Sequence, residues 1–230
     1  MVLPDDTITV ESPVRRFVSR GGEKLDAALD RFDIDVTGKH AVDAGASTGG
    51  FTDCLLSRGA VHVVALDVGY GQLHWRLRED PRVTVLERKN VRELRPEDVP
   101  QPAEIITADL SFISLRLALP SLVRCSSRDA EFVLLVKPQF EAGRAEVSRG
   151  GVVSDPAVWF RVLVEVGEAA AGEGLKPQGM MASPLLGPAG NAEFLLHARR
   201  GGSGGEPIAD FGLAARRAVE QAQELIPSHG

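Results

Sequence analysis

Short, mostly apolar runs alternate with helix-length segments along the chain. The runs lie near residues 40–46, 61–68, 83–87, 103–109 and 131–137. The segments near 49–58, 70–79 and 113–124 have the length and composition of helices. Strands that are apolar on both faces and alternate with helices are typical of a parallel sheet that is covered on both sides. The pattern therefore predicts a doubly wound α/β domain.

The same pattern predicts helices before and after these strands. From Gly22 onward, apolar residues recur at helical spacing, and Lys24 lies at the start of that helix, off the apolar stripe. A longer helix is predicted to begin at a cap formed by Ser154 or Asp155 and to end at the glycines near 172–174. Two more strands are then predicted, PQGMMASPL and EFLLHARR, on either side of the turn-rich segment LGPAGNA.

These elements together predict a seven-stranded, mostly parallel sheet with an antiparallel last strand. Residues 201–207, GGSGGEP, have the composition of a flexible linker, and residues 211–226 are predicted to form a terminal helix. This order of elements is that of the Rossmann-like class I methyltransferases, although other doubly wound folds share it.

Composition excludes several classes of protein. No apolar run is long enough to cross a bilayer, and the first residues lack the basic and apolar order of a secretory signal. Cys54 and Cys125 do not suggest a disulfide framework or a metal site, so we expect a cytoplasmic protein. The net charge of −6 argues against indiscriminate coating of nucleic acid but leaves room for local basic patches.

A glycine-rich loop follows the first predicted strand. Residues 43–51 read DAGASTGGF, in which Ser47 replaces the central glycine of a dinucleotide fingerprint, and no phosphate-loop lysine follows. Asp67 ends the second strand and can accept hydrogen bonds from both hydroxyls of a cofactor ribose. Asp43 is expected near the positive amino-acid end of S-adenosylmethionine. These residues alone leave NAD as an alternative, as well as simple helix capping by Asp43 and Asp67.

Four charged residues are predicted to converge beside this loop. Lys24 starts the first helix, Asp109 and Lys137 end the fourth and fifth strands, and Glu193 begins the last strand. Ligands of doubly wound sheets bind beyond the carboxyl ends of the parallel strands, and an antiparallel last strand begins at that same edge.

The motifs KLDAAL, DAGASTGGF, ITADLSFISL, LLVKPQFEAGR and SPLLGPAGNAEFLL resemble those of the TlyA family of rRNA ribose 2'-O-methyltransferases, relatives of FtsJ. The resemblance extends from about residue 7 to residue 200. It implies S-adenosyl-L-methionine as cofactor, cytidine in small- or large-subunit rRNA as substrate, and a catalytic tetrad at Lys24, Asp109, Lys137 and Glu193. In our hypothesis, Lys137 is the base or orients the hydroxyl, Asp109 fixes Lys137, and Lys24 and Glu193 hold the ribose and tune the charge.

The predicted cofactor-binding residues are Asp43, Gly45, Ala46, Ser47, Thr48, Gly49, Gly50, Phe51, Asp67, Val68, Glu87, Arg88, Asn90 and Asp109. The resemblance places Glu87, Arg88 and Asn90 near adenine, and the alternative is that they cap the third strand and begin a turn. Phe112 is expected in the adenosine pocket or in the core. No metal is expected, and the histidines at 62, 74 and 197 are interpreted as structural.

Residues 1–20 are interpreted as a remnant of an N-terminal RNA-binding module with its linker, residues 21–200 as the FtsJ-like domain, and residues 201–230 as a linker with a helix. We expect rRNA or ribosomal subunits as partners and no association with a membrane. A monomer is the favoured oligomeric state. The alternatives are a haemolysin, or a methyltransferase acting on tRNA or a small molecule.

The sequence VSRGG occurs at 18–22 and again at 147–151. We expect both copies at the mouth of the site; alternatively they are a hinge and a helix lead-in. The predicted RNA-binding residues are Arg15, Arg16, Arg20, Arg144 and Arg149.

Overall fold

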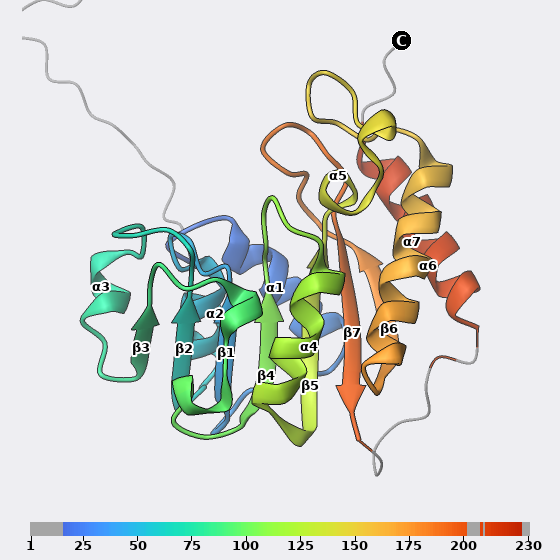
Figure 1. The fold of residues 1–230 in the computed structure, drawn as a ribbon. Helices are drawn as coiled ribbons and strands as arrows, with labels where there is room; N and C mark the ends of the chain where they lie inside the picture. Colours follow the sequence, from blue (N-terminus) through green and yellow to red (C-terminus); the bar gives the residue numbers. More distant parts are fainter. Residues whose placement is uncertain (1–15, 202–207, 209, 227–230) are drawn as a thin grey trace, which may run out of the picture.

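The computed structural model describes residues 16–201, 208 and 210–226. Its centre is a sheet of seven strands in the order β3-β2-β1-β4-β5-β7-β6 (Figure 1). The strands are β1 (His40–Ala44), β2 (His62–Leu66), β3 (Val83–Leu86), β4 (Ala103–Ala108), β5 (Ser126–Val136), β6 (Leu175–Ala182) and β7 (Phe194–Arg200). Strands β1 to β5 pair in parallel, whereas β7 is antiparallel to both β5 and β6. This is the class I methyltransferase arrangement that the sequence predicts.

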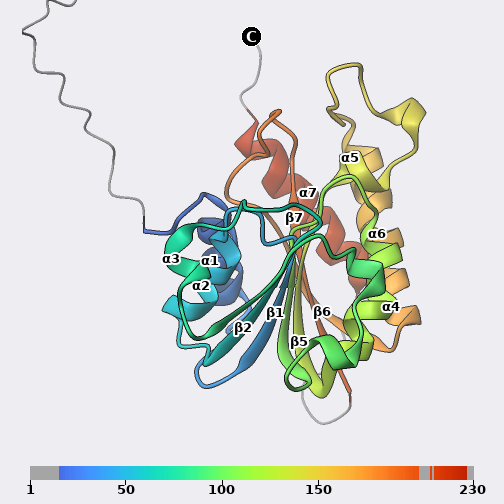
Figure 2. The same ribbon diagram turned by 60° about the vertical axis from the view of Figure 1, so that its left-hand side comes forward.

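Helices cover both faces of the sheet (Figure 2). The α-helices are α1 (Gly21–Arg31), α2 (Gly50–Ser57), α3 (Trp75–Arg78), α4 (Leu115–Cys125), α5 (Pro138–Glu141), α6 (Pro156–Gly172) and α7 (Phe211–Leu225), and the 3-10 helices are η1 (Val91–Glu93), η2 (Pro96–Asp98) and η3 (Arg144–Glu146). One buried apolar cluster joins α1 and α2 to the sheet, and a second joins α4, α6 and α7 to its other face. The two clusters fix the carboxyl edge of the sheet, where the predicted site lies.

The predicted helix over 70–79 is wrong for most of its length, because only Trp75–Arg78 is helical. Backbone N–H groups before this short helix donate hydrogen bonds to carboxylates instead: Gly69 donates to Asp67 and Gly71 donates to Glu87. Gly71 also has a positive φ of 69°, which is incompatible with a right-handed helix. The loop therefore takes a course that supports Asp67 rather than continuing α3.

Both ends of the described chain pack on the domain. Phe17 is 3% exposed and lies in the cluster beneath α1, although we expected the domain to begin at residue 21. The backbone N–H of Val18 donates to Asp53, 2.8 Å away. At the other end, the ring of Phe211 on α7 occupies the space beside Gly167 where any larger residue would collide with it. Helix α7 is thus part of the fold and not an appendage, while most of the predicted linker at 201–207 lies outside the described residues.

Candidate active site

The loop that follows β1 brings its backbone close to the end of β4. Gly45 and Gly49 have positive φ angles of 85° and 98°, and Ser47 adopts the left-handed region at 48°. A side chain at Gly45 would collide with the backbone carbonyl of Asp109, so glycine is required there. The loop leads into the N-terminus of α2, as the sequence predicts for a ligand-binding turn.

Asp67 is held in place by the loop it faces. Its carboxylate accepts hydrogen bonds from the backbone N–H of Ser47 at 2.8 Å and of Gly69 at 2.7 Å. A carboxylate has lone pairs for about four donors, so two bonds leave capacity for further hydroxyl groups. The geometry fits the predicted role of Asp67 toward a cofactor ribose.

A cavity of about 910 Å³ opens beside Asp67 at the carboxyl edge of the sheet. Of the predicted cofactor residues, Gly45, Ser47, Asp67, Val68, Asn90 and Asp109 line it. The others do not belong to its wall, namely Asp43, Ala46, Thr48, Gly49, Gly50, Phe51, Glu87 and Arg88. The cavity has room for a nucleoside cofactor, because ligand pockets typically measure roughly 300–1,000 Å³.

Asp43 lies behind the loop rather than on the cavity wall. Its side chain is fully buried and accepts hydrogen bonds from Thr52 at 2.7 Å and Thr107 at 3.2 Å. Burial raises the pKa of Asp43 to about 7, and the nearby charge of Asp109 adds to the effect. A cationic group brought close to Asp43 would therefore favour loss of its proton.

The three residues expected near adenine have local structural roles. Glu87 accepts from the backbone N–H of Gly71 at 2.8 Å and pairs with Arg78, whose guanidinium lowers the pKa of that carboxyl. Arg88 stands over the ring of Tyr70, 4.2 Å from its centroid. Asn90 caps η1 and lies on the cavity wall. Asn90 alone of the three faces the cavity, so a role toward adenine stays a prediction for Glu87 and Arg88.

The four predicted catalytic residues form two ion pairs. Lys137 Nζ lies 2.5 Å from Asp109 Oδ1 and donates to Ser111 Oγ at 3.2 Å. Lys24 pairs with Glu193, and their side chains are 10% and 1% exposed. Lys24 is buried although it is off the apolar stripe of α1, and it pairs there with Glu193, the residue before β7.

Strand register relates the two ion pairs. Val136 faces Phe194 in the last recorded pair of the antiparallel β5–β7 ladder. Lys137 and Glu193 are the residues next to this pair, so each ion pair has one member at this end of the ladder. Asp109 likewise follows Ala108, whose partner on β5 is Leu134. The four residues thus form two ion pairs, and Asp109 also lines the cavity, while their convergence into one catalytic site stays a prediction.

The predicted RNA-binding arginines have different surroundings. Arg144 is exposed and lines the cavity, and Arg20 and Arg149 are exposed at the start of α1 and in the turn before α6. Arg16 instead pairs with Asp26, which also binds Arg58 on α2. Arg15 lies outside the described residues. Three arginines are thus free to meet a polyanion near this edge, while Arg16 fastens the start of the domain.

The sequence interpretation missed the exposed aromatic group at the mouth of the cavity. Phe112 was expected in the adenosine pocket or the core, but it is 91% exposed and has a positive φ of 62°. Its ring lies 5.1 Å from that of Phe140, and both residues line the cavity. A strained and exposed phenylalanine suggests function, but its φ angle is not readable from a sequence.

The histidines have structural contacts. His197 bonds Glu131 at 2.7 Å and stacks on Phe32, His62 bonds Thr84 at 2.9 Å, and His74 caps α3. Among the residues that the structure describes, no cluster of His, Cys, Asp or Glu side chains could hold a metal ion. Within the same residues, no helix has the length and apolar character of a membrane span.

The FtsJ-like methyltransferase family model matches residues 17–200. A 16S/23S rRNA (cytidine-2'-O)-methyltransferase TlyA from Mycobacterium tuberculosis is 55% identical over 84% of this chain and 72% of its own length. Hemolysin A from Brachyspira hyodysenteriae is 40% identical over 84% of this chain and 80% of its own. A solved structure from Streptococcus thermophilus, provisionally named as a hemolysin, superposes with a TM-score of 0.87 at 40% identity, covering 93% of this chain and 77% of that one. Solved S-adenosylmethionine-dependent methyltransferases at 15–16% identity share the fold alone. The chain belongs to the TlyA family of FtsJ-like methyltransferases.

Proposed function

We propose that this chain transfers a methyl group from S-adenosylmethionine to a ribose 2'-hydroxyl of cytidine in ribosomal RNA, with Lys24, Asp109, Lys137 and Glu193 as its catalytic residues. Family membership and the rRNA methyltransferase from Mycobacterium tuberculosis support the reaction. The observation that carries the assignment of residues is that the four side chains form two ion pairs, one of which includes Asp109 on the cavity wall. We expect the protein to act in the cytoplasm, where ribosomal subunits are, and as a monomer.

The cavity supplies what the cofactor requires. The Asp67 carboxylate is aimed by two backbone N–H groups and can accept the ribose hydroxyls. Gly45 allows close backbone approach, and Asp109, which pairs with Lys137, also lines the cavity. When bound, S-adenosylmethionine supplies an electrophilic methyl group on a sulfonium. The protein therefore needs only to align the hydroxyl and to manage its proton.

Lys137 is the residue that acts on the hydroxyl. An ammonium group has three N–H donors, and Asp109 and Ser111 take two of them, which leaves one for the ribose oxygen. In the neutral form the same nitrogen accepts the proton of the hydroxyl. Lys24 and Glu193 form the second ion pair of the proposed tetrad, and we assign them to holding the ribose.

Arg20, Arg144 and Arg149 are proposed to bind the phosphate backbone of the RNA. All three are exposed, and arginine pairs with phosphate in a forked geometry. Gly150 and Gly151 of the second VSRGG copy lie in a turn beside Arg149 and let it adjust to a backbone, whereas Gly21 and Gly22 of the first copy begin α1. Base contacts, which would select cytidine, are not assigned to any of them.

A transfer assay tests the proposal. Purified protein is incubated with radiolabelled S-adenosylmethionine and with small subunits, large subunits, naked rRNA or tRNA, and the labelled nucleotide is identified after digestion. We expect label in 2'-O-methylcytidine of rRNA. Label in tRNA alone, or in a base instead of a ribose, would contradict the proposal.

The name of the Brachyspira hyodysenteriae relative supports a second candidate, a membrane-active protein. Leakage of a dye from liposomes on addition of the purified protein would favour this candidate. The cofactor cavity favours methyl transfer, so we expect no leakage at protein concentrations that give full methylation.

A further inference from the structure

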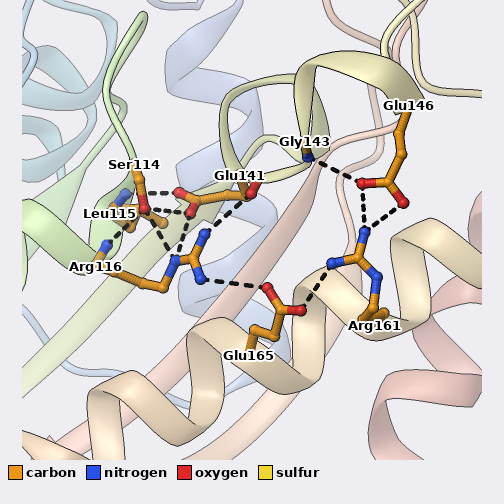
Figure 3. Close-up of polar contacts among 8 residues, drawn as sticks. All are labelled: Ser114, Leu115, Arg116, Glu141, Gly143, Glu146, Arg161 and Glu165. Atoms are coloured by element: carbon orange, nitrogen blue, oxygen red, sulfur yellow. Dashed lines mark hydrogen bonds and ion pairs between the residues drawn. The ribbon is translucent and has the colours of Figure 1, made fainter.

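Glu141 is a buried carboxylate that contacts the start of α4 (Figure 3). Its side chain is 2% exposed. One oxygen accepts from the backbone N–H of Leu115 at 2.6 Å, and the other accepts from Ser114 Oγ at 2.5 Å. Burial raises the pKa of Glu141, while these donors oppose that rise. The helix N-terminus is a favourable place for the charge, because unpaired N–H groups gather there.

Arg116 completes the surroundings of this carboxylate. Its Nε lies 3.4 Å from Glu141 Oε2, and its Nη2 donates to the backbone carbonyl of Glu141 at 3.0 Å. Arg116 also meets Glu165 on α6 at 3.3 Å, and Glu165 binds Arg161 at 2.7 Å (Figure 3). Glu141 is the buried member of this chain of contacts, whereas Glu165 and Arg161 are partly exposed.

The place of Glu141 in the chain relates it to the catalytic residues. Glu141 follows Lys137 by four residues, and Ser114 follows Asp109 by five. The two strand-end segments 109–114 and 137–141 are therefore joined twice, by the Lys137–Asp109 ion pair at one end and by the contacts of Glu141 at the other. Between these junctions, Phe112 and Phe140 approach each other and both segments line the cavity.

We propose that Glu141 is a positioning residue for methyl transfer, which holds the segment after Lys137 against the segment after Asp109 so that Lys137 keeps its place beside Asp109, which lines the cavity. This inference rests on the proposed function of Lys137. Without the Glu141 carboxylate, Ser114 and the N–H of Leu115 lose their partner and segment 137–141 loses its buried attachment to α4. The Lys137–Asp109 pair then has to hold the two segments by itself.

The alternative is that Glu141 only stabilises α4. The two roles differ in what a variant does at saturating substrates, because a helix cap contributes to the free energy of unfolding but not to kcat of the molecules that stay folded. A misplacement of about 1 Å at a catalytic group costs up to roughly a hundredfold in rate. A loss of kcat at a temperature where the variant stays folded therefore supports positioning, whereas a lowered Tm with kcat retained supports a purely structural role.

The experiment compares E141A and E141Q with E165Q in the full chain. E165Q is the matched control, since it makes the same chemical change in the same network without touching Ser114 or Leu115. For each protein, kcat and KM for methyl transfer to rRNA, the Kd of S-adenosylhomocysteine and the Tm are measured. Amide hydrogen exchange of segments 109–116 and 137–141 is measured as well, because it reads positioning without requiring activity.

We expect E141A to lower kcat about 10- to 100-fold while Kd changes less than about threefold, with faster exchange in both segments. E141Q should keep kcat within about fivefold of wild type, because an amide still accepts from Leu115 and donates to Ser114. E165Q should match wild type. If E141A does not fold, S114A replaces it and should give a smaller loss of kcat in the same direction.

Two results would overturn the inference: an E141A kcat within about twofold of wild type despite a lowered Tm, or E141Q being as impaired as E141A. Failure of the proposed function looks different, because the wild-type protein would then label no RNA. The hydrogen exchange of the two segments would still report whether Glu141 holds them together.

Discussion

Lys24 and Glu193 form an ion pair that is shielded from water, although 169 residues separate them in the chain. The first helix and the last strand meet only through the fold, so this contact joins the two ends of the domain at the catalytic edge. Removing one partner of a buried pair leaves an uncompensated charge, which typically costs about 3–5 kcal/mol. The pair is therefore expected to contribute to stability as well as to the proposed chemistry.

A double-variant cycle separates these two contributions. We expect E193L and K24M each to lower the free energy of unfolding in urea by about 3 kcal/mol, because each leaves a buried charge alone. The combined variant should regain most of that stability, since no charge remains, yet it should transfer no methyl group to rRNA. A combined variant that was active would remove both residues from the chemistry.

Variants of Lys137 test whether this residue is a base or an orienting group. K137A should lower kcat by about 10²-fold or more while the Kd of S-adenosylhomocysteine is unchanged. K137R keeps a permanent positive charge and N–H donors but has no accessible neutral form. Recovery by arginine would assign Lys137 to orientation, and no recovery would favour the base. Lys176, near the start of β6, provides the control K176A, which should behave as wild type.

The parts of the site that depend on strand ends were predictable from sequence. Asp67 and Asp109 follow apolar strands, and parallel strands end at a common edge, so their convergence follows from topology. The burial of Lys24 was not predictable in the same way, because the helical stripe places it outside the core and only Glu193 draws it in.

Loops account for the rest of what the sequence did not predict. Phe112 adopts a left-handed backbone conformation that its residue type disfavours, and Glu141 at the end of α5 reaches Ser114 and Leu115 only through the fold. The helix predicted over 70–79 failed because carboxylates from Asp67 and Glu87 bind the N–H groups of that loop. The Gly71–Glu87 and Ser114–Glu141 contacts are non-local, so periodicity carries no signal of them.

Asp67 is expected to anchor the cofactor. D67A removes the acceptor for the ribose hydroxyls and the partner of the Ser47 and Gly69 N–H groups. Hydrogen bonds to a charged group contribute about 1.5–3 kcal/mol, so the Kd of S-adenosylhomocysteine should rise roughly 10- to 100-fold in calorimetry. An unchanged Kd would show that the cofactor does not use this edge of the cavity. D80A, in the exposed turn before β3, should bind as wild type does.

The two VSRGG copies are expected to act on RNA and not on the cofactor. R20A combined with R149A should weaken RNA binding and flatten its dependence on salt, because each lost phosphate contact removes about one unit from the slope of log K against log salt. Filter binding at several salt concentrations measures this slope. R128A, at the opposite edge of the sheet, controls for loss of net charge. An unchanged slope would leave the repeated sequence as a coincidence of loop composition.

The raised pKa of Asp43 should make the free energy of unfolding fall as pH rises from about 4 to about 7. Its pKa is about 7 in the fold against 3.8 for an ordinary carboxyl, so between these values the folded protein holds a proton that the unfolded chain has released. The resulting contribution is fully present below pH 3.8 and is lost as pH rises through about 7. D43N removes this term, so the stability of wild type relative to D43N should fall by an amount on the order of a few kcal/mol between pH 4 and pH 8. Urea unfolding across that range measures the difference.

D35N, at an exposed aspartate whose pKa is lowered by the backbone N–H of Thr37, should leave the slope above pH 5 unchanged. Parallel curves for wild type and D43N would mean that Asp43 keeps its charge inside the fold, stabilised by Thr52 and Thr107 alone.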